Sequence, residues 1–339
     1  MVTIKEIAQA VGVSPATVSR VLNYDTTLSI SAKKRKAIIE TAEALDYATP
    51  RNRNRAAGAG AGASAARVAL VNFSSQADEI ADPYYIGVRF GIQNRCQAQR
   101  IETFTVYDVS ESQDRAALQG LTGIIVLGKH EEDEVSWLLS LEVPLVITDV
   151  LACPGAFDFV ESDLEFAMAQ LLDALHGAGY GRIAFIGGKA SRHTTAPFGE
   201  KRCSAYIAWM ESKGLFDPAL CLVDAMSFES GYQLAQQVLA EKERPDVIIT
   251  ANDNMAIGAY RAVQELGLSV PNDVGIVGFN DIPAAQFLAP PLSTVRLHAE
   301  RIGETAVELL LEQIGGRDYF KKVSLSTEMI WRESCRSPK

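Results

Sequence analysis

The sequence predicts an all-α helix-turn-helix domain at the N-terminus, followed by a larger α/β domain with parallel sheets. Three observations predict this division: helical periodicity broken by a glycine within the first two dozen residues, an Ala/Gly/Ser tract at residues 56–66, and short apolar runs alternating with amphipathic segments from residue 67 onward. Because 339 residues are too many for one ordinary hydrophobic core, two or three domains are expected.

Two short helices are expected first. The first helix has apolar residues at helical spacing: Ile4, Ile7, Ala8 and Val11. Gly12 then supplies a turn, Ser14 is placed to cap the second helix, and Pro15 suits its first position, where no partner needs an N–H. The second helix has its own apolar stripe: Val18, Val21 and Leu22. This arrangement is typical of a helix-turn-helix.

Small and polar residues cover the rest of the second helix, so its backbone can lie deep in a DNA major groove. Arg20 can then form two hydrogen bonds to one guanine, which makes Ala16 and Arg20 the expected sequence-reading positions. The alternative is a small helical subdomain with a solvated arginine. A third segment counts against that alternative, because Ser31 can cap another helix. Its inward apolar residues would close a three-helix core: Ile38, Ile39, Ala42 and Leu45.

Charge is divided unevenly along the chain. The whole chain has a net charge of -10, but residues 1–67 contain ten Lys and Arg against five Asp and Glu, so this part carries +5 and the remainder -15. The asymmetry indicates a basic nucleic-acid-binding part attached to an acidic body. The basic run at residues 33–36 can reach phosphates, and residues 49–66 have the composition of a linker.

From residue 67, apolar runs predict two buried parallel sheets. The expected strands are 67–73, 123–127, 144–148, 182–187, 245–250 and 274–279, separated by helices such as 84–100, 164–178 and 231–241. Ligands bind beyond the carboxyl ends of such strands. Polar residues follow three of these ends: Asp149, Asn252, Asp253, Asn280 and Asp281. Each of them can also be a turn or helix-capping residue.

Residues 17–23 (TVSRVLN), preceded by IKEIA from Ile4 and GVS from Gly12, resemble the headpiece of the lactose/galactose repressor (LacI/GalR) family. Further blocks extend the resemblance over the chain: DPYY from Asp82, ANDNMAIGA from Ala251, VGFND from Val277 and PPLSTV from Pro290. The resemblance implies a DNA-binding headpiece at 1–48, a hinge or linker at 49–66, and an effector-binding and dimerisation domain at 67–339.

In that family, the effector-binding domain is like a periplasmic sugar-binding protein, with two lobes joined by three crossings of the chain. Here the N-lobe would comprise about 67–162 and 294–322, and the C-lobe about 163–292 and 323–339. The crossings would fall near Ser162, between Pro290 and Val295, and near Lys322.

The resemblance also implies an effector cleft between the lobes. Its expected contacts are Asp82, Tyr84, Tyr85, Asp149, Phe198, Arg202, Met226, Asn252 and Asn280. Carboxylates, amides and a guanidinium can pair sugar hydroxyls, and an aromatic ring can cover a sugar's apolar face. A saccharide effector is therefore expected. The blocks at 82–85, 204–206 and 279–283 are most similar to the branch that represses β-galactosidase operons, which predicts a galactoside. Other members have polar or aromatic residues where this chain has Met226, Leu297 and Ala299, which argues against a simple monosaccharide fit.

On double-stranded operator DNA, the expected contacts are Ser14, Pro15, Ala16, Thr17, Ser19, Arg20, Asn23, Ser31, Arg51, Arg53 and Arg55. The family's hinge wedges a leucine into the minor groove, but no Leu occurs here between Asp46 and Leu70. We therefore expect the three hinge arginines to hold the minor groove electrostatically, with a steep salt dependence and without strong kinking. Since no leucine heptad follows Trp331, a homodimer is expected and not a tetramer.

Other functions fit the sequence less well. A transport binding protein should carry a secretory signal where this chain has its helix-turn-helix, and an enzyme should carry a nucleophile, a base or a cofactor loop. The best catalytic candidate is His193, in a polar loop near the expected cleft. A corepressor-dependent regulator of the same family and a sugar-binding protein without a DNA role remain alternatives. We expect no enzyme activity, cofactor, metal or membrane partner, five reduced cysteines, and a cytoplasmic location.

Overall fold

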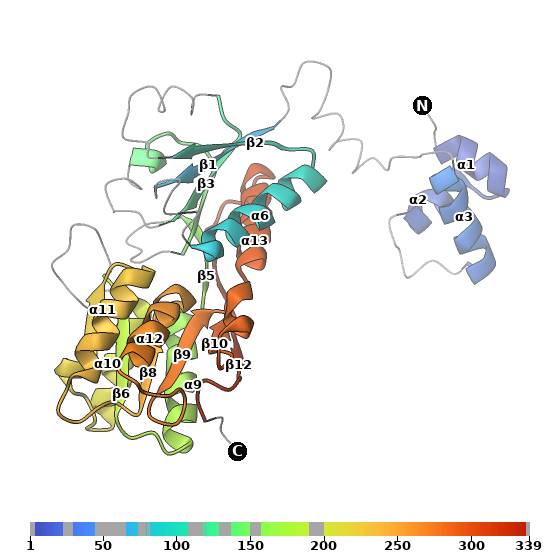
Figure 1. The fold of residues 1–339 in the computed structure, drawn as a ribbon. Helices are drawn as coiled ribbons and strands as arrows, with labels where there is room; N and C mark the ends of the chain where they lie inside the picture. Colours follow the sequence, from blue (N-terminus) through green and yellow to red (C-terminus); the bar gives the residue numbers. More distant parts are fainter. Residues whose placement is uncertain are drawn as a thin grey trace. The chain divides into compact units, whose positions relative to one another are not determined.

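The computed structural model describes residues 4–22, 30–44, 66–73, 79, 82–107, 118, 120–128, 137–149, 157–189 and 200–336. The chain forms two compact units, Met1–Ala65 and Ala66–Lys339 (Figure 1). The first unit contains the headpiece, and we call the second unit the body. The hinge arginines Arg51, Arg53 and Arg55 lie outside the described residues.

Three helices make up the described part of the headpiece: α1 (Ile4–Val11), α2 (Pro15–Leu22) and α3 (Ala32–Ala44). Both predicted helix caps are confirmed. Ser14 Oγ accepts a hydrogen bond from the Thr17 amide at 3.1 Å, at the start of α2. Ser31 Oγ accepts one from the Lys34 amide at 3.3 Å, at the start of α3. The turn between α1 and α2 needs a glycine, because Gly12 has a φ of +67°.

Apolar residues of all three helices meet in one small core. Its buried members are Ile7, Ala8, Val18, Val21 and Ile38. The predicted three-helix core is confirmed for these residues. The side chains of Ile39 and Ala42, and the whole of Leu45, lie outside the described part of the chain.

The body contains two sheets of six strands each. The N-lobe sheet has the order β11-β5-β4-β3-β1-β2, and all of its strands are parallel. Its strands are β1 (Arg67–Asn72), β2 (Glu102–Tyr107), β3 (Gly123–Leu127), β4 (Leu145–Thr148), β5 (Asp158–Ser162) and β11 (Lys322–Leu325). The six predicted strands are all present, three in each sheet.

The C-lobe sheet has the order β12-β10-β9-β8-β6-β7, and only β12 runs antiparallel to its neighbour. Its strands are β6 (Ile183–Gly188), β7 (Cys221–Asp224), β8 (Val247–Thr250), β9 (Gly275–Asn280), β10 (Ser293–Arg296) and β12 (Glu328–Ile330). Strands β2, β7, β11 and β12 were not predicted because they are edge strands with half-exposed, partly polar residues. Sequence patterns also missed β5 and β10, which contain charged residues within short runs.

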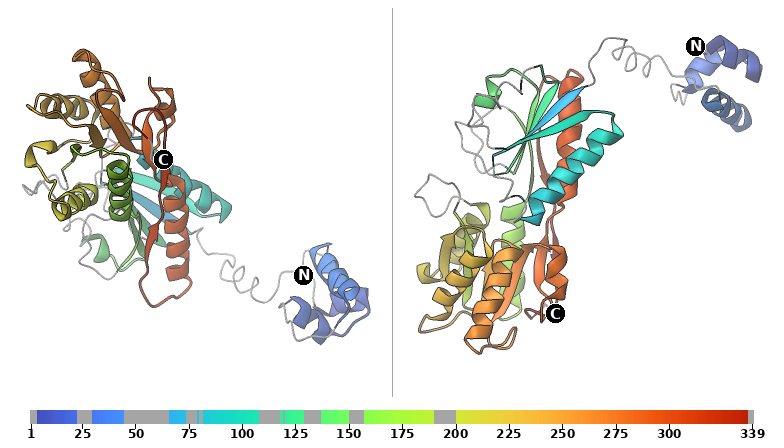
Figure 2. Two further views of the ribbon diagram at one scale, coloured as in Figure 1. Left: turned by 90° about the horizontal axis from the view of Figure 1, so that it is seen from below. Right: turned by 45° about the horizontal axis from the view of Figure 1, so that its top comes forward.

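Helices α6 (Pro83–Ala98) and α13 (Ala299–Ile314) lie side by side against the N-lobe sheet (Figure 2). A Cβ at Gly91 would collide with the Glu300 carbonyl, so this close crossing needs a glycine. The C-lobe repeats this arrangement: a Cβ at Gly258 in α12 would collide with the Phe228 carbonyl in α11. The helices of the C-lobe are α9 (Leu164–Gly177), α10 (Lys201–Ser212), α11 (Phe228–Leu239) and α12 (Asp253–Glu265), with short 3-10 turns at η1 (Pro218–Leu220) and η2 (Pro283–Phe287).

The chain passes between the lobes three times, but two crossings differ from the predicted positions. The first follows β5, at Asp163, as expected. The second lies at residues 297–298 and not between Pro290 and Val295, because β10 pairs with β9 in the C-lobe sheet. The third lies at residues 326–327 and not near Lys322, because β11 pairs with β5 in the N-lobe sheet. The second and third crossings therefore lie closer to the C-terminus than the sequence analysis predicted.

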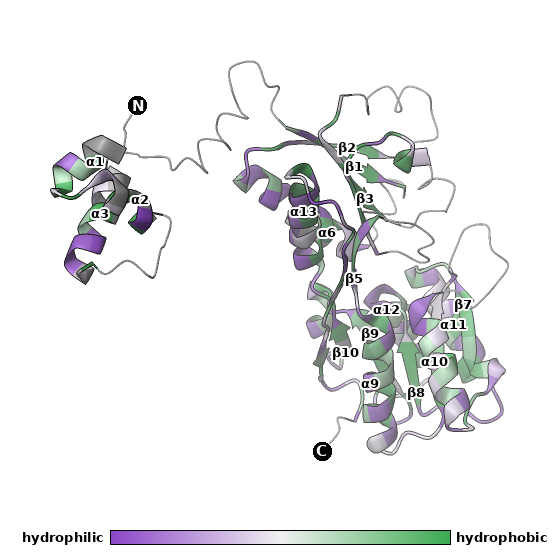
Figure 3. Ribbon diagram, turned by 180° about the vertical axis from the view of Figure 1, so that it is seen from behind, coloured by the Kyte–Doolittle hydropathy of each residue, from purple (hydrophilic) through white to green (hydrophobic). Residues whose placement is uncertain are grey.

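Buried apolar strands carry the core of the body. Central strands such as β4 and β8 are buried along their whole length, and β8 is drawn green in the hydropathy view (Figure 3). One buried cluster includes residues of both lobes, and a second covers the other face of the N-lobe sheet. None of the helices that the structure describes is long and apolar enough to span a membrane.

Candidate ligand-binding site and DNA-binding surface

A cavity lies between the two lobes, where strands of both sheets end. We call it the interlobe cavity. The space between its lining residues amounts to about 690 Å³, which includes open solvent. The N-lobe lines it with Asp82, Tyr84, Tyr85, Asp149, Glu161 and Ser162. The C-lobe and the second crossing line it with Leu164, Glu200, Lys201, Arg202, Met226, Asn252, Asn280 and Leu297.

Of the nine residues expected at the cleft, the structure describes eight and brings all eight to the interlobe cavity. They are Asp82, Tyr84, Tyr85, Asp149, Arg202, Met226, Asn252 and Asn280. Phe198 and the catalytic candidate His193 lie outside the described residues. Leu297 also lines the cavity, whereas Ala299 does not appear among its lining residues.

The sequence analysis did not predict five residues of the cavity wall, four of them polar or charged: Glu161, Ser162, Leu164, Glu200 and Lys201. The first three flank the first crossing, at the end of β5, which was not predicted as a strand. A signal was present for Glu200, because it precedes the apolar periodicity of α10 and caps that helix. Its carboxylate accepts hydrogen bonds from the amides of Arg202 and Cys203.

Helix starts and left-handed backbone positions aim several polar side chains into the cavity. Asp82 caps α6, accepting a hydrogen bond from the Tyr84 amide at 3.1 Å, and Pro83 follows at the first helical position. Asn252 caps α12 in the same way. Asp149 and Asn280 have φ values of +55° and +106°, a region that asparagine and aspartate tolerate better than most residues.

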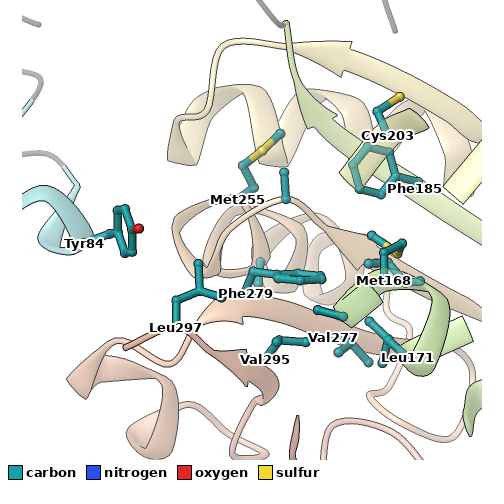
Figure 4. Close-up of a cluster of buried hydrophobic side chains, with 14 of the residues drawn as sticks. Tyr84, Met168, Leu171, Phe185, Cys203, Met255, Val277, Phe279, Val295 and Leu297 are labelled. Atoms are coloured by element: carbon teal, nitrogen blue, oxygen red, sulfur yellow. The ribbon is translucent and has the colours of Figure 1, made fainter. Parts of the chain in front are cut away.

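Tyr84 and Asp149 form a fixed pair in the N-lobe wall. The Tyr84 hydroxyl donates a hydrogen bond of 2.8 Å to Asp149 Oδ2. Burial raises the pKa of Asp149 to about 6, although the hydrogen bond from Tyr84 opposes this rise. Figure 4 shows Tyr84 projecting from α6, with its hydroxyl on the side that faces Leu297 and Phe279.

Arg202 is held rigidly in the C-lobe wall. Its Nε donates to Glu200 Oε1 at 2.8 Å, and one terminal nitrogen donates to the Ala251 carbonyl. The guanidinium also lies 5.6 Å from the ring centre of Phe279. These contacts fix the orientation of the guanidinium before a ligand binds. Its remaining N–H groups can therefore donate to a ligand with little further loss of side-chain entropy.

The cavity therefore combines acceptors, donors and an aromatic surface around one space. Carboxylates of Asp82 and Asp149 and the amide of Asn280 can pair hydroxyl groups, and Tyr85 supplies a ring. Such a lining suits a neutral polar molecule with several hydroxyls. Among the residues described, no cluster of three or more His, Cys, Asp or Glu is arranged to hold a metal ion.

The headpiece exposes part of the expected DNA-reading surface. Ser14, Pro15 and Arg20 are exposed, Thr17 is half-buried, and Ser31 is exposed at the start of α3. Ser14 and Ser31 use their hydroxyls as helix caps. The side chains of Ala16 and Ser19, and the whole of Asn23, lie outside the described residues.

Three helices with a capped second helix, together with a two-lobed α/β body around a cavity, define a DNA-binding regulator with a small-molecule site. Residues 3–50 match "Bacterial regulatory proteins, lacI family", and residues 172–335 match "Periplasmic binding protein-like domain". The "HTH-type transcriptional regulator GalR" of Lacticaseibacillus casei is 35% identical over 98% of this chain and 99% of its own.

A "Lactose operon repressor" of Rhizobium radiobacter is 63% identical over 110 residues, which are 32% of this chain and 97% of that protein. The solved lac repressor dimer bound to operator and the anti-inducer ONPF has the same fold, with a TM-score of 0.70 and 23% identity over 98% of each chain. The chain belongs to the lacI family of bacterial regulatory proteins, as its sequence motifs predicted. It is a DNA-binding transcriptional regulator and not an enzyme.

Proposed function

We propose that this protein represses transcription by binding an operator of two inverted half-sites, and that a galactoside releases it. The interlobe cavity is the observation that carries the proposal, since both lobes surround it with hydroxyl-pairing groups. The similarity to a lactose operon repressor and to a GalR regulator supports a galactoside over a purine. A regulator of this kind would work in the cytoplasm, where its DNA lies.

In this proposal, the second helix of the headpiece reads bases and its surroundings contact phosphates. Exposed Arg20, in the last turn of α2, reads one base pair. The remaining contacts proposed are Ser14, Pro15, Ala16, Thr17, Ser19, Asn23, Ser31, Arg51, Arg53 and Arg55. The operator's two-fold symmetry would match that of a homodimer.

Exposed apolar side chains of the body support the homodimer. Ile86 and Phe90 on α6 are 37% and 51% exposed, and Phe287 in η2 is 81% exposed. Ile86 and Phe90 line one surface groove together with Pro283 of η2, and contiguous apolar surface is typical of an interface between protein chains. A second copy of this chain would bury them, and the lac repressor to which this fold is similar is a dimer.

Effector and operator are coupled by linkage. Suppose that the effector prefers an arrangement of the lobes that the operator complex disfavours. The factor by which the effector lowers the affinity for operator then equals the factor by which operator lowers the affinity for effector. A corepressor-dependent regulator would show the opposite sign, with ligand strengthening operator binding.

The first test is a thermal shift of the full chain with lactose and other galactosides, with unrelated sugars and with purines. A ligand at about a hundred times its dissociation constant stabilises a protein by about 2.7 kcal/mol. A shift confined to galactosides is the expected result. A shift with a purine or another sugar alone would contradict the galactoside assignment, and no shift with any of them would contradict ligand sensing by these classes.

A further inference from the structure

Two charged residues that the proposed function does not use join the lobes across the interlobe cavity. Glu161 lies in β5 of the N-lobe sheet, and Lys201 is the first residue of α10 in the C-lobe. Lys201 Nζ donates a hydrogen bond to Glu161 Oε2, so the two residues form an ion pair between the lobes. Both residues line the cavity.

This ion pair is more shielded from water than an ordinary surface pair. The side chains of Lys201 and Glu161 are 23% and 18% exposed, whereas those of Lys189 and Asp224, an ion pair within the C-lobe, are 56% and 45% exposed. Partial burial weakens screening by water and salt, which strengthens the attraction between the charges. Another hydrogen bond between the lobes at the cavity joins Asn252 Nδ2 to Asp82 Oδ2 at 3.5 Å, which is long for a hydrogen bond.

The pair also balances charge within the cavity wall. Besides burial and the hydrogen bond from Tyr84, the charge of Glu161 raises the pKa of Asp149, and the charge of Lys201 lowers it. Without Lys201, the carboxylates of Glu161 and Asp149 would repel each other with less compensation. Opening the lobes would return both partners to water, so the attraction exists only while the lobes are close.

We infer that Glu161 and Lys201 are positioning residues, whose ion pair holds the two lobes in the arrangement that encloses the effector. A ligand surrounded by both lobes favours the same arrangement, so the pair increases effector affinity by increasing the population of the binding-competent state. The part of this inference that concerns effector affinity rests on the proposed function. The part that concerns lobe closure does not.

The direct test is hydrogen exchange, followed by mass spectrometry, on the full ligand-free chain. Lys201→Met and Glu161→Gln should each increase amide exchange at residues 157–164 and 297–300, which border two crossings, by about threefold to tenfold. The double variant should exchange no faster than either single variant, because the two residues act through each other. Lys189→Met, which breaks the exposed pair within one lobe, is the matched control and should leave these segments unchanged.

Additive effects of the two substitutions, or exchange equal to that of the unaltered protein, would overturn the inference. Thermal unfolding checks that each variant is folded. Lactose affinity supplies the second readout: both single variants should weaken it by the factor that exchange measures. A Lys201→Met variant that loses lactose affinity without faster exchange would make Lys201 a ligand contact and overturn the positioning role. If neither lactose nor another galactoside binds the unaltered protein, the galactoside proposal fails, whereas the exchange experiment still decides the role of the pair.

Discussion

At the residue scale, several side chains of the interlobe cavity stabilise the fold as well as line the site. Asp82 and Asn252 cap α6 and α12 while their side chains border the cavity. The sequence left open whether polar residues after strand ends are caps or site residues. For Asn252 the two alternatives do not compete, because its capping oxygen accepts from the Met255 amide while its amide nitrogen, on the cavity side, can donate, as it does to Asp82.

Arg20→Ala tests the base-reading residue of the headpiece. It should weaken operator binding by roughly 1–3 kcal/mol and relax the preference at one base pair, because a bidentate contact to guanine is lost. Binding to single-base variants of the operator measures both effects. Arg20→Lys, which keeps the charge, should also lose the preference. Equal weakening on every operator variant would instead make Arg20 a phosphate contact.

The raised pKa of Asp149 predicts that effector binding depends on pH. Its pKa of about 6 means that the carboxylate is ionised at pH 7.5 and largely protonated at pH 5. Since the ionised form is the better acceptor for ligand hydroxyls, galactoside affinity should fall over this range, by about tenfold if only the ionised form binds. Affinity measured by calorimetry should lose this dependence in Asp149→Asn. A parallel fall in that variant would rule out Asp149 as the group responsible.

Protein stability should respond to the same titration with the opposite sign. The folded-state pKa of Asp149 is raised above its ordinary value of 3.8, so the folded chain binds this proton more tightly than the unfolded chain. The stabilising contribution is present below about pH 4 and is lost as the pH rises through about 6. Acidification therefore stabilises the fold through Asp149 while it weakens effector binding.

At the element scale, the sequence predicted those elements whose pattern reflects full burial. Strands β3, β4 and β8 are continuous apolar runs because helices or loops cover both faces. Edge strands such as β11 alternate between exposed and half-buried residues and leave no such run. The crossings were misplaced for the same reason, since β10 and β11 decide them.

The crossing of α6 and α13 depends on glycine. Gly91→Ala should lower the free energy of unfolding by about 1–3 kcal/mol, because the added methyl group meets the Glu300 backbone and the helices must move apart. Gly177→Ala in α9 is the matched control, since nothing lies near its Cβ position, and it should be neutral or stabilising. Urea denaturation measures both. Equal stabilities of the two variants would show that the crossing adjusts without cost.

At the scale of the whole molecule, resemblance to a family predicted most of the site, and local pattern did not. Residues as distant as Asp82 and Asn280 meet only because two sheets end at one cavity, which no local spacing reveals. Glu161 and Lys201 escaped prediction because their roles arise from lobe packing. Each looks like an ordinary surface charge in sequence.

Dimer formation should depend on the apolar surface that includes η2. Phe287→Asp should weaken the dimer, because burying one phenylalanine contributes roughly 1.5–3 kcal/mol per subunit. Phe320→Asp replaces another exposed phenylalanine, in the segment between α13 and β11, and should leave the dimer intact. Light scattering over a range of concentrations distinguishes the variants. A tetramer, or equal effects of both substitutions, would contradict the proposed interface.

We propose that a galactoside in the interlobe cavity controls operator binding by the headpiece. The most direct measurement is operator affinity of the full chain with and without saturating galactoside, together with galactoside affinity with and without operator. Both affinities should fall, and by the same factor, because coupling between two binding sites is reciprocal. A galactoside that binds the protein while operator affinity stays unchanged would contradict it.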